Sequence, residues 1–153
     1  MKKTVTILFF SAFIISCNSS RIYEKFLKIE DSVWKTDDIK TFDVTIADTG
    51  KLYQVFFNIR NSTKYEFSNL WVFITIEAPN GQIKADTFEI ILANDLGEWK
   101  GSGLGNINSV EQQYFKHPVK FPQSGIYNFR VQQAMRREEL KEITDIGLRI
   151  ESY

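Results

Sequence analysis

The stretch TFDVTIADTGKLYQVFFNI (residues 41–59) alternates apolar and polar side chains on both sides of a turn signal. Its first half places Phe42, Val44 and Ile46 on one face, and its second half repeats the pattern with Tyr53, Val55, Phe57 and Ile59. Successive side chains of a β-strand point to opposite faces, so this period predicts two strands that each bury one face. Residues 48–50 (DTG) between them favour a turn.

The same period recurs along the rest of the chain. Further apolar alternations are Leu70, Val72, Ile74 and Ile76; Phe88, Ile90 and Leu92; Tyr127, Phe129 and Val131; and Ile146, Leu148 and Ile150. Turn residues stand at 79–81 (PNG) and 123–125 (QSG). Because no helical stretches separate these runs to make parallel crossovers, we predict an all-β fold, an antiparallel β-sandwich of the jelly-roll or immunoglobulin-like type.

Two segments carry mixed signals. Residues 21–30 combine helical spacing with strand-like content, so their structure is left open. Residues 134–141 (AMRREELK) contain good helix formers, so we expect at most one short helix there. Residues 121–127 (FPQSGIY) resemble the corner that leads into a sandwich strand, with a tyrosine two positions after a turn glycine. We expect one β-sandwich domain over residues 21–153.

Composition excludes several classes of protein. The chain has 153 residues, 19 basic against 19 acidic side chains, one cysteine and one histidine. This length fits one domain with a core of its own. The even charge balance argues against a nucleic-acid partner, which needs a basic surplus. A single cysteine allows no internal disulfide, and a single histidine allows no histidine-rich metal cluster.

The N-terminus predicts a lipoprotein leader. Lys2 and Lys3 precede the apolar stretch VTILFFSAFII (residues 5–15), which is too short for a stable transmembrane helix. Residues 14–17 (IISC) resemble a bacterial lipobox, so we expect residues 1–16 to be a signal peptide and Cys17 to be lipidated. Residues 17–20 then form the lipidated cysteine and its spacer. Lipid chains, rather than charge, are expected to hold the protein on the membrane.

The spacer also bears on location. Asn18-Ser19-Ser20 contains no acidic residue. Bacteroidota lipoproteins exported to the outer face tend to carry an acidic run there, so we expect this protein to face the periplasm. The choice between inner and outer membrane stays open.

Residues that could carry catalysis are sparse. His117 is the one histidine, and no Gly-x-Ser-x-Gly elbow accompanies it. Residues 101–105 (GSGLG) lack the spacing of a phosphate-binding loop, so we expect these glycines to allow a bend or a close backbone approach. The acidic groups at residues 31–38 and 86–98 are too loose to predict a calcium site. We therefore predict no enzyme activity, no catalytic residue, no cofactor and no metal.

The aromatic residues suggest a binding surface. Trp71 and Phe73 lie on the face opposite Leu70, Val72 and Ile74, so this strand is apolar on both sides. One explanation is a central strand covered on both faces; the other is an exposed patch for a protein partner or a sugar ring. Since aromatic residues, Met and Arg are enriched at interfaces, our candidates are Trp71, Phe73, Trp99, Tyr114, Met135 and Arg136.

Several segments together resemble one family. In order behind the leader they are residues 65–70 (YEFSNL), 86–89 (DTFE), 99–103 (WKGSG), 121–127 (FPQSGIY), 133–136 (QAMR) and 145–151 (DIGLRIE). They resemble the GldH-type gliding-motility lipoproteins of Bacteroidota. The resemblance implies a non-enzymatic, lipid-anchored envelope protein that supports gliding and the type IX secretion machinery, with other envelope proteins as partners. The alternative is a lipid-anchored carbohydrate-binding module, and a hydrolase built around His117 is a third possibility.

Overall fold

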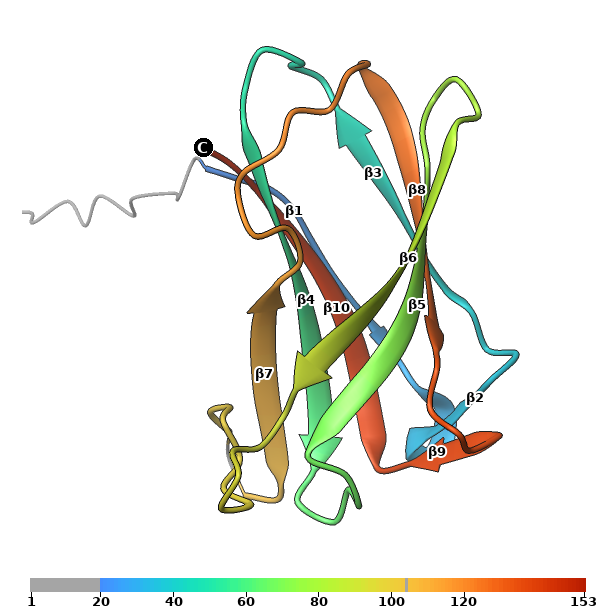
Figure 1. Ribbon diagram of the computed structural model, residues 1–153, viewed down its shortest axis with the longest axis vertical. Coiled ribbons are helices and arrows are strands. Elements are labelled where there is room, and N and C mark those ends of the chain that lie inside the picture. The colour runs from blue at the N-terminus through green and yellow to red at the C-terminus, as the bar shows by residue number, and fades with distance from the viewer. Residues whose placement is uncertain (1–19, 104) are drawn as a thin grey trace, which may run out of the picture.

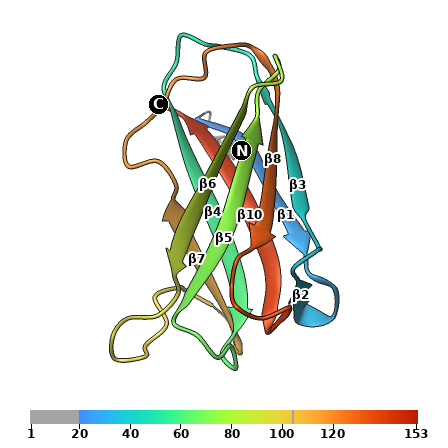
Figure 2. The same ribbon diagram turned by 45° about the vertical axis from the view of Figure 1, so that its right-hand side comes forward.

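The computed structural model describes residues 20–103 and 105–153, which form two packed four-stranded sheets (Figure 1). The first sheet runs in the order β1 (Arg21–Lys28), β10 (Ile143–Ser152), β4 (Tyr53–Ser62) and β7 (Ile107–Gln113). The second runs in the order β3 (Lys40–Ile46), β8 (Gly125–Gln133), β5 (Asn69–Glu77) and β6 (Ile83–Ile91). In Figure 2 the second sheet lies in front of the first. The predicted leader and Cys17 lie outside the described residues.

The strand pairing is nested around the middle of the chain. All pairs are antiparallel, and β1 pairs with β10, β3 with β8, β4 with β7 and β5 with β6. The chain is therefore one long hairpin rolled into two sheets. Pairing of β10 with β4 completes the first sheet, and pairing of β5 with β8 completes the second. This is the strand order of a jelly roll. The predicted all-β sandwich is confirmed, and of the two types expected it is the jelly roll.

The core lies between the sheets, on the faces that the alternation predicted. The inward side chains lose all exposure to solvent: Phe42, Val44, Ile46, Val55, Phe57, Ile59, Leu70, Val72, Ile74, Phe129, Val131, Ile146, Leu148 and Ile150. Because each strand contributes every second residue, the outward faces are left to polar side chains and to the few aromatic residues discussed below.

A short third pair closes one end of the sandwich. β2 (Val33–Lys35) pairs with β9 (Glu139–Lys141), which places Trp34 opposite Leu140. Trp34 is fully buried, and its indole Nε1 donates a hydrogen bond of 2.8 Å to the Asp38 carbonyl. β2 and β9 also obey the nested order, so they mark where the rolled hairpin passes from one sheet to the other.

Two uncertain segments are now settled. Residues 21–28 form strand β1, and residues 134–141, where at most one short helix was expected, contain none. Leu140 is 2 % exposed and pairs with Trp34 in β9, so burial and strand pairing override the helix propensity of AMRREELK. The one helical turn among the described residues is the 3₁₀ turn η1 (Glu30–Ser32).

Two local predictions are confirmed. At the corner before β8, the Tyr127 hydroxyl donates to the Gln123 carbonyl at 3.0 Å and accepts from the Gln123 amide at 3.2 Å. Gly101 and Gly103 lie close to β7, since a Cβ at Gly101 would stand 2.3 Å from the Ser109 carbonyl oxygen and one at Gly103 would stand 1.8 Å from that of Ile107. Glycine is required there for close backbone contact, as expected.

Candidate functional site

A groove of about 540 Å³ lies where the outer face of β5 meets the segment that follows β8. We call it the Trp71 groove. It is lined by Phe67, Asn69, Trp71, Phe73, Thr87 and residues 134–137. Four of the six candidates chosen from the sequence therefore meet at one place: Trp71, Phe73, Met135 and Arg136. In the sequence, β6, β7 and β8 separate the first two from the last two.

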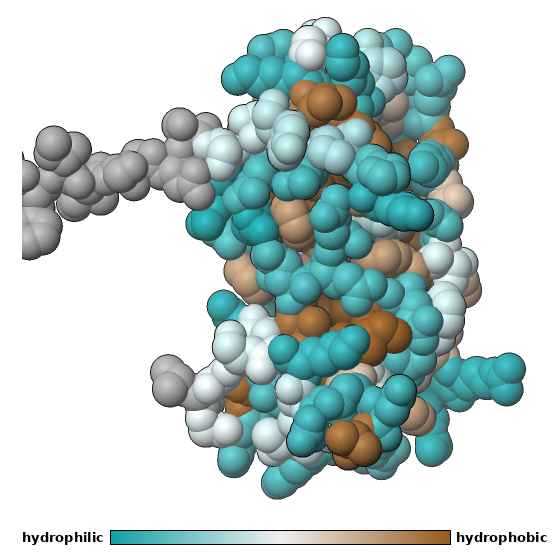
Figure 3. Space-filling model, turned by 60° about the vertical axis from the view of Figure 1, so that its left-hand side comes forward, coloured by the Kyte–Doolittle hydropathy of each residue, from teal (hydrophilic) through white to brown (hydrophobic). Residues whose placement is uncertain are grey.

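The two aromatic candidates on β5 are exposed. Trp71 keeps 38 % and Phe73 keeps 49 % of its surface in contact with solvent, whereas Leu70, Val72 and Ile74 between and beside them are fully buried. The strand is thus apolar on both faces because one face packs in the core and the other lines the groove. Figure 3 shows the side on which β7 lies in Figure 1; there, hydrophilic residues dominate and hydrophobic ones form small, separate patches.

The opposite wall of the groove is a loop fixed to β5. The Ala134 amide donates to the Trp71 carbonyl at 2.8 Å, which extends the β5–β8 pairing by one residue. The Met135 sulfur then lies 3.3 Å from the Trp71 amide nitrogen, which donates to it. These contacts place the Met135 thioether beside the backbone of Trp71 in the groove.

Gln133 holds this loop from beneath. Its side chain is fully buried; its Oε1 accepts from the Met135 amide at 2.9 Å, and its Nε2 donates to the Arg137 carbonyl at 2.7 Å. Nε2 also donates to the Thr36 hydroxyl at 3.0 Å. One buried amide therefore satisfies backbone groups on both sides of Arg136, so the loop is shaped before anything binds.

We expect Gln133→Met to cost about 1–3 kcal/mol of unfolding free energy, because the volume is kept while the Met135 amide and Arg137 carbonyl lose a buried partner. Gln132→Met is the matched control, since that neighbouring, only partly buried side chain also makes a hydrogen bond, to the Thr36 carbonyl. The control is expected to lose under about 1 kcal/mol. Urea denaturation followed by circular dichroism measures both, and equal losses would contradict the role given to Gln133.

The other two candidates lie elsewhere. Tyr114 is 8 % exposed and packs edge-on against Phe57 and Phe88, so as a surface residue it is a wrong choice. Its hydroxyl donates to the Asp86 carboxylate at 3.0 Å; burial, and then this hydrogen bond, raise the pKa of the phenol above its usual value. Trp99 is partly buried against the core and bridges to Ala93, outside the groove.

Sequence reasoning missed part of the lining. Phe67 and Asn69 continue the alternation backward from Trp71 and Phe73, and this pattern could have identified them. Arg137 directly follows a chosen candidate. Thr87 carries no such signal, because its position opposite Phe73 depends on the β5–β6 register.

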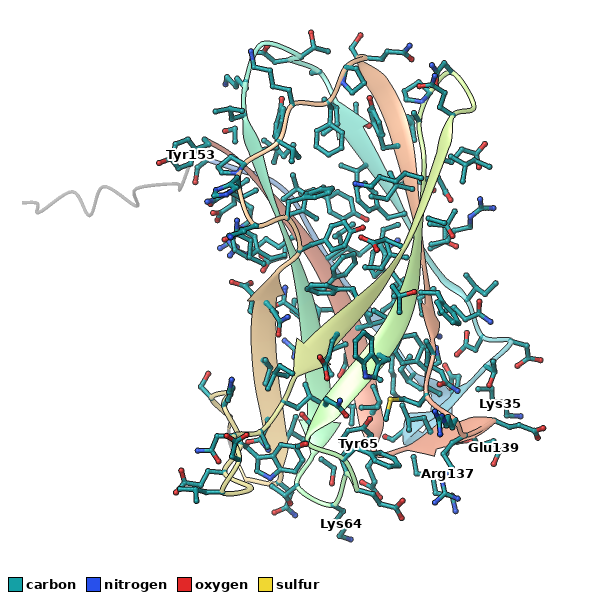
Figure 4. All side chains as sticks on the ribbon, in the orientation of Figure 1. Lys35, Lys64, Tyr65, Arg137, Glu139 and Tyr153 are labelled. Carbon is teal, nitrogen blue, oxygen red and sulfur yellow. The ribbon has the colours of Figure 1, made fainter. Side chains whose placement is uncertain are left out.

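A smaller hollow of about 280 Å³ continues from the groove and shares Phe67 and Arg137 with it. Its other residues carry both charges: Lys64, Tyr65, Glu66 and residues 139–142. Figure 4 shows Lys64, Tyr65, Arg137 and Glu139 at one end of the sandwich and Tyr153 at the other. The hollow and the groove beside it are therefore remote from the start of β1, because Ser152 donates to the Ser20 carbonyl at the Tyr153 end.

The groove offers apolar and cationic contacts rather than a reactive group. The carboxylate of nearby Glu89 accepts a hydrogen bond of 2.6 Å from the side-chain Nδ2 of Asn69. His117 is exposed in the segment between β7 and β8 and does not line the groove. Within residues 20–103 and 105–153, no three His, Cys, Asp or Glu side chains are grouped so that they could hold a metal ion.

The comparisons with known proteins agree over nearly the whole chain. The family model described as GldH lipoprotein matches residues 21–150. The chain belongs to the GldH lipoprotein family. It is 37 % identical to the gliding motility lipoprotein GldH homolog of Christiangramia forsetii, over 95 % of this chain and 90 % of that one. It is 34 % identical to the gliding motility lipoprotein GldH of Flavobacterium johnsoniae, over 99 % and 97 %.

GldH family membership makes this chain a membrane-anchored gliding-motility lipoprotein and confirms the resemblance found in the sequence. No helix in the described part of the chain is long and apolar enough to cross a membrane. Among solved structures, dimeric latent PorU from Porphyromonas gingivalis aligns with 87 % of this chain at 11 % identity and a TM-score of 0.32. The chain spans 13 % of PorU, and a score this low supports no conclusion about fold or function.

Proposed function

We propose that the protein is a non-catalytic envelope component that supports the gliding and type IX secretion machinery by binding another envelope protein in the Trp71 groove. The observation that carries this proposal is the meeting of Trp71, Phe73, Met135 and Arg136 in one open groove. Exposed aromatic residues beside Met and Arg have the composition of an interface core. Large apolar side chains gathered in one exposed groove commonly mark a binding surface.

The anchor completes the proposal. Cys17 carries the lipid, three residues before the described domain begins at Ser20. The domain then sits on the membrane with its Tyr153 end toward the lipid, facing the periplasm because no acidic run follows Cys17. Protection from added protease in intact cells, with cleavage after the outer membrane is permeabilised, tests this location.

Deleting the gene is expected to abolish colony spreading and to reduce adhesin secretion, and the wild-type gene is expected to restore both. The double variant Trp71→Ala/Phe73→Ala is expected to restore neither, although it reaches the membrane at normal abundance. Ile83→Ala/Ile126→Ala is the matched control: these two side chains are 61 % and 59 % exposed on the same sheet but do not line the groove. Normal spreading of the deletion strain would refute the function.

A further inference from the structure

We propose that the Trp71 groove takes an acidic segment of a partner protein, one that carries carboxylates beside apolar side chains. This rests on the proposed function, because it names the chemistry of the partner that the groove would bind. The two arginines of the groove decide the charge: Arg136 and Arg137 line it, and no carboxylate does. Among the described ion pairs neither guanidinium takes part.

On the outer face of the first sheet, arginine and aromatic residues interact with one another and with carboxylates of the same chain. On its outer face the Arg149 guanidinium lies 4.2 Å from the centre of the Phe56 ring and pairs with both Glu111 and Glu151. Arg60 lies 4.1 Å from the centre of the Phe26 ring. There the two guanidinium groups cover the two rings, and the charge of Arg149 is neutralised by carboxylates of the same chain.

The Trp71 groove also combines arginine with aromatic residues, but its described residues show neither a cation over a ring nor an ion pair of an arginine. The Trp71 and Phe73 rings are 38 % and 49 % exposed, and no described cation lies over either of them. Carboxylates would pair with the free guanidinium groups, while apolar side chains would cover the rings and the Met135 thioether. An uncharged sugar would leave both cations unpaired, which is why we choose an acidic peptide segment.

Position favours a protein segment over lipid. Glu142, at the groove's neighbouring hollow, directly precedes β10, and the far end of β10 at Ser152 contacts Ser20 near the anchor. β10 has ten residues, so it spans roughly 30 Å at 3.3 Å a residue. Because Cys17 is three residues before Ser20, the Ser152 end of β10 is the end tied to the bilayer, and the groove lies about one strand length from it. The groove is thus held away from the headgroups.

Photo-crosslinking in living cells tests the proposal with the full-length lipoprotein. p-Benzoylphenylalanine in place of Phe73 is the probe, and the same amino acid in place of Ile126 is the control, since Ile126 is 59 % exposed on the outer face of the same sheet. After irradiation, the crosslinked peptide is sequenced by mass spectrometry. We expect Phe73 to capture one protein segment that contains at least two carboxylates and neighbouring apolar residues, and the Ile126 position not to capture it.

Charge variants complete the test. Arg136→Glu/Arg137→Glu is expected to lower the adduct at position 73 about tenfold or more, whereas Arg136→Lys/Arg137→Lys retains most of it. Lys51→Glu/Lys120→Glu makes the same change in net charge at exposed sites outside the groove and is expected to have no effect. Equal membrane abundance and circular dichroism of the variants show that folding is intact.

The outcomes separate this inference from the proposed function. An adduct with a segment lacking carboxylates, with a glycan or with phospholipid overturns the acidic-segment proposal, as does no adduct above the Ile126 control. An acidic adduct that is lost in Arg136→Glu/Arg137→Glu supports it. If those cells still spread normally, the partner chemistry stands and the role of the groove in motility fails.

Discussion

Cys17→Ala is expected to abolish fatty-acid incorporation completely and to leave residues 1–16 on the chain. In bacterial lipoproteins the lipid is attached through the sulfur of the lipobox cysteine, here predicted to be Cys17, and the chain contains no second cysteine that could replace it. A metabolically incorporated alkyne-labelled fatty acid measures the first effect, and the larger apparent mass on a gel measures the second. Ser16→Ala is the matched control, since it keeps a small residue before the cysteine and is expected to be lipidated normally.

The physical consequence is loss of the membrane anchor. Each buried methylene contributes about 0.8 kcal/mol, so several acyl chains hold a protein stably where a single chain does not. Of the 19 basic side chains, Lys2 and Lys3 lie in the predicted signal peptide, so residues 17–153 have 19 − 2 = 17 basic against 19 acidic side chains. This slightly negative domain has no electrostatic attraction to anionic lipid that could replace the lipid anchor. When residues 1–17 are exchanged for a cleavable secretory signal without a lipobox, we expect the domain in the soluble fraction. Label incorporation in Cys17→Ala would contradict the lipoprotein mechanism.

Trp34→Ala is expected to cost about 3–5 kcal/mol of unfolding free energy, a large share of the roughly 5–15 kcal/mol of a typical domain. The indole is fully buried between the two sheets' ends and donates to the Asp38 carbonyl. Its removal leaves a cavity, an unpaired carbonyl and a β2–β9 pair without its central contact. We also expect the loop at residues 134–138 to loosen, because the Thr36 amide donates to the Glu138 carbonyl just beyond β2.

Trp71→Ala provides the matched comparison, the same substitution at a residue 38 % exposed in the groove. It is expected to cost about 1 kcal/mol, since the ring lies in an open groove on the outer face of the sheet and its removal leaves no cavity in the core. Urea denaturation followed by circular dichroism measures both variants without depending on tryptophan fluorescence. A Trp34 variant as stable as the Trp71 variant would contradict the role of the β2–β9 pair as a buried closure of the sandwich.

The outer faces of the two sheets carry similar arginine and aromatic residues, but the rings are covered in the first sheet and exposed in the second. In the first sheet, Gly147 lies beneath Phe26, since a Cβ there would stand 2.7 Å from the ring, and Arg60 covers the ring from above. In the second sheet, Trp71 and Phe73 lack such a cover, and the arginines that could supply one are held on the neighbouring loop by Gln133. Exposure of the groove is therefore a property of the loop's hydrogen bonds as much as of β5 itself.

Period-two alternation in the sequence determined which segments are strands and which of their faces are buried. The physical reason is local: every second side chain of a strand lies on the same face, and these side chains are buried together. The pattern in residues 41–59 therefore predicts the inward faces of β3 and β4 by itself. It could not reveal β7, whose sequence INSVEQQ carries little alternation and is a strand because β4 provides its hydrogen-bond partners. Nor could it exclude a helix at residues 134–141, where propensity opposed the tertiary structure.

Tertiary structure alone decided the nested strand order and the groove. Backbone hydrogen bonds between strands are nearly independent of side-chain identity, so the sequence does not state which strand pairs with which. That pairing brings Met135 to the Trp71 amide, places Thr87 opposite Phe73 and withdraws Tyr114 into the core. The two strands predicted from residues 41–59, β3 and β4, lie in different sheets. The turn between them carries the chain across the sandwich instead of pairing the two strands as a hairpin.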